Sequence, residues 1–227
     1  WNTPIRIEKY DLNMDEEISI IDKRTRNERV KNFFVDNKKK IIFGILSIIL
    51  LIFVFYSYEI YKERFKNQLS DKYNTAIIEY KSGDKSKTSS LLVEVVKDKD
   101  STYSPLALYF ILDNNLINDQ NKINDLFDLV INKITLEKEI KNLIIYKKAL
   151  YNADNIGENQ LLEMLNPLIN SQSVWKSHAL YLLAEYFYNK NEKEKSKEFF
   201  TQILNTKNAN QDLVKESQKR LNRDLSE

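Results

Sequence analysis

Few residues in this sequence could perform chemistry, because its 227 residues include one histidine and no cysteine. Without cysteine the chain has no thiolate nucleophile, no thiolate metal site and no disulfide framework. His178 could act as a general base, but no nucleophile or carboxylate stands in a recognisable motif around it. We therefore expect His178 to serve packing or a binding groove, and we expect no enzymatic activity, no metal site and no cofactor.

Two polar segments superficially suggest function. Residues 82–88 (Ser-Gly-Asp-Lys-Ser-Lys-Thr) resemble a phosphate-binding loop, but they lack the second glycine and the Gly-Lys-Ser/Thr order, and they follow a helical pattern instead of a strand. We expect Gly83 to end a helix in the left-handed conformation. Residues 192–198 alternate Glu and Lys, which predicts a solvated helix face with i,i+4 ion pairs.

Charge is distributed unevenly along the chain, although the net charge is only +2. Residues 1–22 carry two basic and six acidic residues, and residues 23–40 carry eight basic and two acidic residues. Residues 41–58 have no charged residue, and the remainder is balanced with 25 of each sign. The basic character of the chain is therefore local to one segment, and it predicts neither a nucleic-acid partner nor a small-molecule substrate.

The uncharged segment 41–58 predicts a transmembrane helix, since 13 of its 18 residues are Ile, Leu, Val or Phe. A helix of this length measures about 27 Å, close to the hydrocarbon core of a bilayer. Eight Lys or Arg precede it within 18 residues and four follow it within 18, which favours a cytoplasmic N-terminus. We expect a cytoplasmic tail at residues 1–40, one span in a bacterial inner membrane, and a periplasmic domain at residues 59–227.

The start of the chain raises two expectations of its own. Met14 opens the sequence Met-Asp-Glu-Glu, so we hypothesise that it is the physiological start and that residues 1–13 are an upstream extension. Apolar residues at helical spacing in residues 16–35 predict a short amphipathic helix with a basic face. This helix contacts anionic headgroups or a cytosolic partner, or it is an ordinary topogenic flank.

The domain at residues 59–227 is predicted to be all-α, with Gly83, Pro105, Gly157 and Pro167 as its only strong punctuation. Five offsets recur with separations of 35, 38 and 35 residues, which is the period of a tetratricopeptide-like solenoid of about four degenerate hairpins. A terminal helix at about residues 212–225 would cap it. The recurring positions are Ala76, Gly83, Thr88, Leu92 and Val95; Ile111, Asn118, Ile123, Phe127 and Val130; Ala149, Ile156, Leu161, Leu165 and Leu168; and Ala184, Asn191, Ser196, Phe200 and Ile203.

Small residues at two of these offsets let paired helices approach closely. Ile123 and Leu161 stand where the strict pattern has Ala, so the middle hairpins are expected to pack less regularly. The same alignment places a tyrosine-rich set on the concave surface, where it either binds polypeptide or closes the interhelical core. The expected partner-binding residues are Tyr73, Tyr80, Tyr146, His178, Tyr181, Glu185 and Tyr188, with Ile77, Leu108 and Leu112 beside them.

The order of segments resembles a known family. Residues 30–39 (Val-Lys-Asn-Phe-Phe-Val-Asp-Asn-Lys-Lys) precede the span, and residues 101–107 (Ser-Thr-Tyr-Ser-Pro-Leu-Ala) and 173–180 (Ser-Val-Trp-Lys-Ser-His-Ala-Leu) follow it. With these segments the chain resembles the YfgM family, the tetratricopeptide-repeat-like ancillary subunit of the bacterial Sec translocon, over residues 14–225. The resemblance implies an inner-membrane protein that associates with the translocon and with periplasmic chaperones.

The expected function is a membrane-anchored protein–protein interaction scaffold that assists export and folding of translocated proteins. An envelope-assembly scaffold unrelated to Sec is an alternative. A membrane-anchored enzyme is a second alternative, and it predicts a deep polar pocket with perturbed titratable groups near His178. A repeat protein on the cytosolic surface of a eukaryotic organelle is a third.

Overall fold

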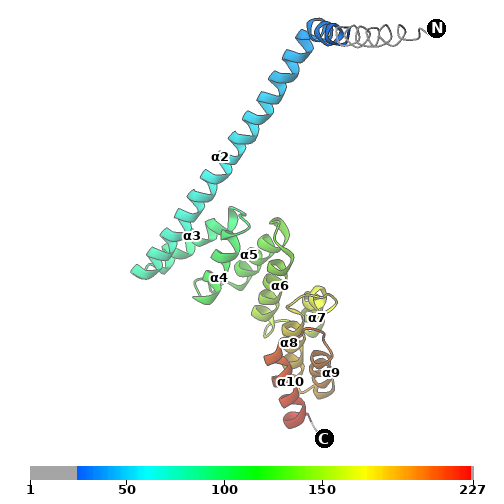
Figure 1. Ribbon diagram of the computed structural model, residues 1–227. Helices are drawn as coiled ribbons and strands as arrows, with labels where there is room; N and C mark the ends of the chain where they lie inside the picture. Colours follow the sequence, from blue (N-terminus) through cyan, green and yellow to red (C-terminus); the bar gives the residue numbers. More distant parts are fainter. Residues whose placement is uncertain (1–24, 226–227) are drawn as a thin grey trace, which may run out of the picture. The chain divides into compact units, whose positions relative to one another are not determined.

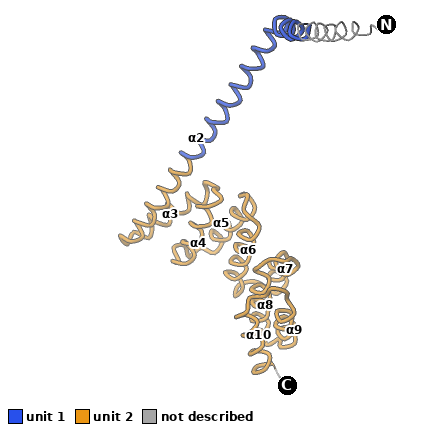
Figure 2. Tube along the Cα trace, viewed as in Figure 1, with its two compact units in different colours: residues 1–64 blue, residues 65–227 orange. Residues whose placement is uncertain are grey.

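The computed structural model describes residues 25–225, which form helices, turns and loops without a strand. The all-α prediction is therefore confirmed for the described part of the domain at residues 59–227. The chain divides into two compact units, residues 1–64 and 65–227 (Figure 2). The expected start at Met14, the extension at residues 1–13 and the first part of the predicted helix at residues 16–35 lie outside the described residues.

The described chain begins in helical residues 25–36, which end at a turn at Asn37. The helices that follow (Figure 1) are α2 Lys38–Ser82, α3 Lys85–Lys97, α4 Tyr103–Asp113, α5 Gln120–Lys133, α6 Lys138–Asn152, α7 Glu158–Ile169, α8 Lys176–Asn189, α9 Lys193–Leu204 and α10 Gln211–Asp224. The terminal helix predicted at residues 212–225 thus corresponds to α10.

Helix α2 contains the predicted span and is long and apolar enough to cross a membrane. Its most apolar 18-residue window has a mean hydropathy of 2.6, and no residue of that window is buried within the protein. Phe43, for example, exposes 74 % of its surface. A soluble core helix would be covered by other elements, whereas this segment presents apolar side chains on every side. α2 also extends beyond the predicted segment, because its residues up to Ser82 supply the first helix of the second unit.

The helix boundaries in the second unit follow from local capping chemistry. Asp84 accepts a hydrogen bond from the backbone N–H of the third residue of α3, and Asp119 and Asn210 cap α5 and α10 in the same way. Gly83 ends α2 with φ of 94°, which confirms the left-handed helix end predicted for it. Asn191 takes the equivalent role between α8 and α9 with φ of 65°.

The two prolines predicted as punctuation both lie within helices. Pro105 is the third residue of α4, where a missing N–H costs nothing because the first turn has no intrahelical acceptor for it. Pro167 lies inside α7, two residues before the helix ends. It removes one hydrogen bond near the helix end, and α7 continues through it instead of stopping.

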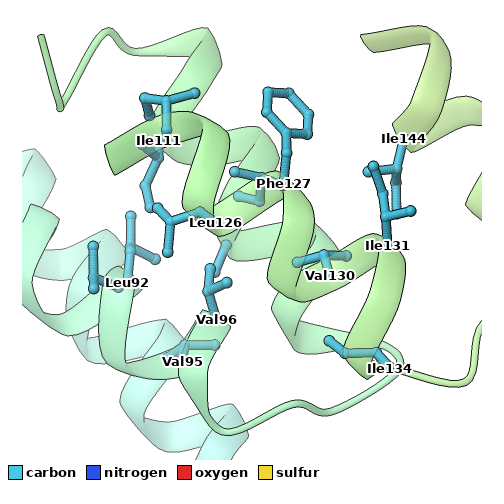
Figure 3. Close-up of a cluster of buried hydrophobic side chains, with 14 of the residues drawn as sticks. Leu92, Val95, Val96, Ile111, Leu126, Phe127, Val130, Ile131, Ile134 and Ile144 are labelled. Atoms are coloured by element: carbon cyan, nitrogen blue, oxygen red, sulfur yellow. The ribbon is translucent and has the colours of Figure 1, made fainter. Parts of the chain in front are cut away.

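The recurring positions of the sequence occupy equivalent places in successive hairpins. Each predicted turn position lies outside a helix, and each of the other recurring positions is buried. Substantial helix contacts among the described residues occur between neighbours in chain order or between helices two apart. Figure 3 shows the core this creates in the first half of the unit, with Leu92 from α3, Ile111 from α4 and Phe127 from α5 converging.

Neighbouring helices differ in how closely their backbones approach each other. α8 and α9 pack most closely, and there the Ser196 hydroxyl donates to the Ala184 carbonyl at 2.8 Å. α4 and α5 carry the larger Ile111 and Ile123 at the corresponding positions and make fewer close backbone approaches. The less regular packing expected of both middle hairpins, at Ile123 and Leu161, is not uniform, because α6 and α7, where Leu161 lies, make more close backbone approaches than α4 and α5.

Candidate functional site

Three of the predicted partner-binding residues of α8 contact the helices that follow it. The Glu185 carboxylate accepts two hydrogen bonds from Arg220, from Nε at 2.9 Å and from Nη2 at 2.8 Å. The Arg220 guanidinium carbon also lies 4.2 Å from the centroid of the Tyr188 ring, which is a cation–π contact. Tyr181 packs edge-on against Phe200 of α9 with centroids 5.5 Å apart. These three residues therefore join α8 to the helices that follow it.

Charge at this junction perturbs two acidic groups. Hydrogen bonds from Arg223 and Arg220, opposed by desolvation, lower the pKa of Asp224 to about 2. Burial raises the pKa of the Tyr181 hydroxyl to about 12, with contributions from the carboxylates of Glu185 and Glu216. Tyr181 is thus a neutral phenol at neutral pH, and it acts through its ring and hydroxyl and not as a base.

Tyr146 and His178 meet between α6 and α8, and Trp175 completes the group. The Tyr146 and Trp175 rings are stacked with centroids 5.9 Å apart, and the His178 ring lies 5.0 Å from Trp175 and 5.8 Å from Tyr146. Burial lowers the pKa of His178, with a smaller opposing effect from the backbone of Val174. The Nδ1 atom of His178 is buried and has no hydrogen-bond partner. Because burial disfavours the charged form, the imidazole is packed as a neutral ring.

Trp175 is held in place by the first turn of α6. Its indole Nε1 donates to the Glu139 carbonyl at 3.1 Å. The Glu139 carboxylate accepts from the Ser173 hydroxyl at 2.7 Å and from the Val174 backbone N–H at 3.1 Å. The segment at residues 173–180 therefore connects α6 to α8. Spacing alone did not identify Trp175 as a site residue, since it precedes the helix and falls outside the recurring offsets.

The tyrosines of α2 pack against α4. The ring centroids of Tyr73 and Tyr103 are 5.9 Å apart, and those of Tyr80 and Phe110 are 5.1 Å apart at a right angle. The expectation that Leu108 lines an open surface is wrong, because Leu108 is completely buried in the core. Ile77 and Leu112 are partly buried.

A cation–π contact joins α4 to α6, through residues that the sequence analysis did not single out. The Lys147 ammonium lies 4.8 Å from the centroid of the Tyr109 ring and 3.9 Å from a carboxylate oxygen of Asp113. Burial raises the pKa of Tyr109 to about 12, and its hydroxyl is buried without a hydrogen-bond partner. No motif could have identified this pair, because Tyr and Lys at these positions carry no recognisable spacing.

These contacts form a continuous series, which we call the first-helix seam. It consists of the side-chain contacts that join α2 to α4, α4 to α6, α6 to α8 and α8 to α10. Each predicted tyrosine except Tyr181 takes part in it, and all of them keep an intermediate exposure. The predicted tyrosines in the seam are therefore neither fully core nor freely exposed, because each ring contacts a neighbouring helix and the residue keeps some exposed surface.

The alternating charge run in residues 192–198 also finds specific partners. Lys195 lies 2.7 Å from Glu192, three residues earlier in sequence, and 2.7 Å from Glu158 on α7. The predicted solvated face is observed, but these pairs have i,i+3 spacing or cross between hairpins instead of following the i,i+4 spacing expected.

A polar pocket of about 490 Å³ lies between two loops, the one before α8 and the one before α10. Lys176, Ser177 and Lys207 line it together with neighbouring loop residues, and none of the predicted site residues does.

Among residues 25–225 there is no cluster of three His, Asp or Glu side chains able to hold a metal ion. No family model, no curated protein and no solved structure matches this chain.

Proposed function

We propose that this protein is a membrane-anchored scaffold that binds other proteins through a tetratricopeptide-like array of helical hairpins. The single observation that carries the proposal is the coincidence between the recurring offsets and the structure. The offsets recur about every 35 to 38 residues, their turn positions lie between helices, and their remaining positions are buried. Arrays of this construction present extended surfaces, and proteins use such surfaces for binding polypeptide.

The proposed anchor is the apolar part of α2. Its 13 large apolar residues supply roughly −4 to −8 kcal/mol for membrane insertion, as an upper value. The basic flank at residues 23–40 supports a cytoplasmic N-terminus, with the hairpin array in the periplasm. Anchoring raises the effective concentration of the array near the membrane, so modest affinity for a partner suffices.

The proposed partner is an emerging polypeptide or a periplasmic chaperone at the Sec translocon. Only the sequence resemblance supports that choice, so an envelope-assembly scaffold remains the second candidate within the same class. The structure bears on the binding surface itself. The predicted tyrosines, Tyr181 among them, keep an intermediate exposure. Tyrosine combines apolar area with a polar tip and little rotamer entropy to lose, which suits contact with varied polypeptide.

A non-enzymatic role is part of the proposal, and the environment of His178 supports it. Its neighbours Tyr146 and Trp175 are aromatic. The imidazole of His178 does not line the polar pocket before α8. A general base needs an accessible proton acceptor in a cleft, whereas this ring is packed between two others.

In-cell photo-crosslinking tests the proposal. An azidophenylalanine replaces Tyr181 in the full chain, and a matched variant carries it at Lys197, an exposed position on the outer side of α9. We expect protein adducts from Tyr181 and few from Lys197, with translocon or chaperone peptides among the adducts. Envelope-assembly proteins in their place would favour the second candidate. Absence of adducts from Tyr181 in a variant with native protease resistance would refute binding at this surface.

A further inference from the structure

The helical residues that precede α2 carry an exposed apolar band. Val30, Phe33 and Phe34 expose 51 %, 60 % and 56 % of their surfaces. At 100° per residue these three side chains fall within an arc of about 100°, which is the width of a buried stripe on an amphipathic helix. Large aromatic residues exposed in this way are uncommon on a soluble surface and indicate an interface.

The charges on this helix are arranged around the band. Arg29 and Lys31 lie on its two flanks, and Arg26 lies within it, one turn before Val30. Glu28 and Asn32 lie on the opposite side. All five side chains are exposed. Long basic side chains beside an apolar stripe can extend to phosphate groups while their stems cover apolar surface.

The helix is also close in sequence to the proposed membrane span. Only Lys38, Lys39 and Lys40 separate the turn at Asn37 from the first apolar residue, a distance of about 5 Å along a helix. Figure 1 shows the chain changing direction between residues 25–36 and α2. A span that starts at Ile41 therefore keeps the band within reach of the headgroup layer.

We propose that residues 25–36 form an interfacial helix that binds the anionic surface of the membrane in which α2 is anchored. Val30, Phe33 and Phe34 enter the boundary between headgroups and acyl chains, and Arg26, Arg29 and Lys31 pair with lipid phosphates. A cytosolic protein is a poorer fit, because the band and its flanking charges match a bilayer surface that the span already holds beside them. The inference rests on the proposed anchor.

Site-specific spin labelling of the full chain tests it, and the absence of cysteine makes each label unique. Val30→Cys places the label in the apolar band and leaves both phenylalanines intact, while Asn32→Cys places it on the opposite face as a matched control. Each labelled protein is reconstituted into vesicles of phosphatidylcholine with a third of phosphatidylglycerol. Retention after carbonate extraction is measured first, and its loss would refute the anchor separately from the helix.

We expect the label at residue 30 to collide preferentially with oxygen, which concentrates in acyl chains, and the label at residue 32 with a water-soluble nickel chelate. Replacing Arg26, Arg29 and Lys31 by Gln should weaken surface binding by about 100-fold, since each basic residue near an anionic surface contributes about five-fold. Equal nickel accessibility of both labels would overturn the inference and favour a protein partner. A label at residue 30 that stays in the acyl region of neutral vesicles and of the Gln variant would overturn the requirement for anionic lipid.

Discussion

The contact between α8 and α10 makes the sharpest prediction, because one residue, Arg220, supplies both its ion pair and its cation–π contact. Arg220→Ala removes two hydrogen bonds to Glu185, one contact with Asp224 and the cation–π contact with Tyr188. The Arg220 side chain is only 13 % exposed and that of Glu185 is 30 % exposed, so water replaces the lost partner incompletely. The variant leaves Glu185 partly desolvated without its counter-ion.

The magnitude follows from the type and burial of these contacts. Hydrogen bonds to charged groups contribute about 1.5–3 kcal/mol, and removing one partner of a fully buried pair costs about 3–5 kcal/mol. Because Glu185 retains some access to water, we expect about 2 kcal/mol of lost stability for α10. This corresponds to about a 30-fold increase in the opening equilibrium of the helix.

Hydrogen exchange measured on peptides from α10 provides the assay, with α6 as the internal reference. Amides in α10 should exchange about 30-fold faster in Arg220→Ala, while α6 remains unchanged. The control is Arg223→Ala, which also removes contacts to Asp224 but from a side chain that is 59 % exposed. Exposed pairs contribute about 0–1 kcal/mol, so this control should change exchange less than about five-fold. Equal effects of the two substitutions would refute the role assigned to Arg220.

Three further predictions concern other helix junctions. His178 has a lowered pKa, so the unfolded state binds its proton first, and stability should fall as the pH drops below its ordinary value of 6.5; amide exchange in α8 should follow that pH, and His178→Phe should abolish the dependence. Ala184→Leu should cost about 1–3 kcal/mol in urea unfolding by forcing α8 from α9, whereas Leu at exposed Lys197 should be neutral. Asn152→Ala should cost about 1–3 kcal/mol, because it removes the buried amide that exchanges hydrogen bonds with the half-buried side chain of Asn124; an unchanged midpoint of urea unfolding would contradict this.

Helical period predicted the buried face of each hairpin because burial within a repeat depends on local spacing. Phe127 and Phe200 occupy the same offset in different hairpins, and both are fully buried. The small residues Ala184 and Ser196 likewise predicted a close helix pair. For Ala184 and Ser196 the partner lies within the same hairpin, so the offset determines both the residue and what it meets.

The tyrosines show what the period leaves open. The period predicts one face for Tyr146 and Tyr188, but their partners Trp175 and Arg220 belong to the next hairpin and to the last helix. Whether the following helix covers a face depends on how successive hairpins are rotated, and the offsets do not contain that rotation. The sequence left open the alternative that the tyrosines close the interhelical space, and their ring contacts fit that alternative. Binding of a partner by the exposed part of these side chains stays a prediction.

The position of α10 connects the seam to the proposed binding role. Each earlier hairpin has its first helix covered on one side by the next hairpin, and α10 provides the same cover for α8 through Arg220. A partner that needed the full ring faces would have to displace α10, and Arg220→Ala would then strengthen binding by releasing that face. A partner that contacts the tyrosines only where α10 leaves them exposed would bind Arg220→Ala less well, because the substitution removes the contact that positions the Tyr188 ring. Crosslinking from Tyr181 in the Arg220→Ala background therefore distinguishes the two modes by the direction of the change.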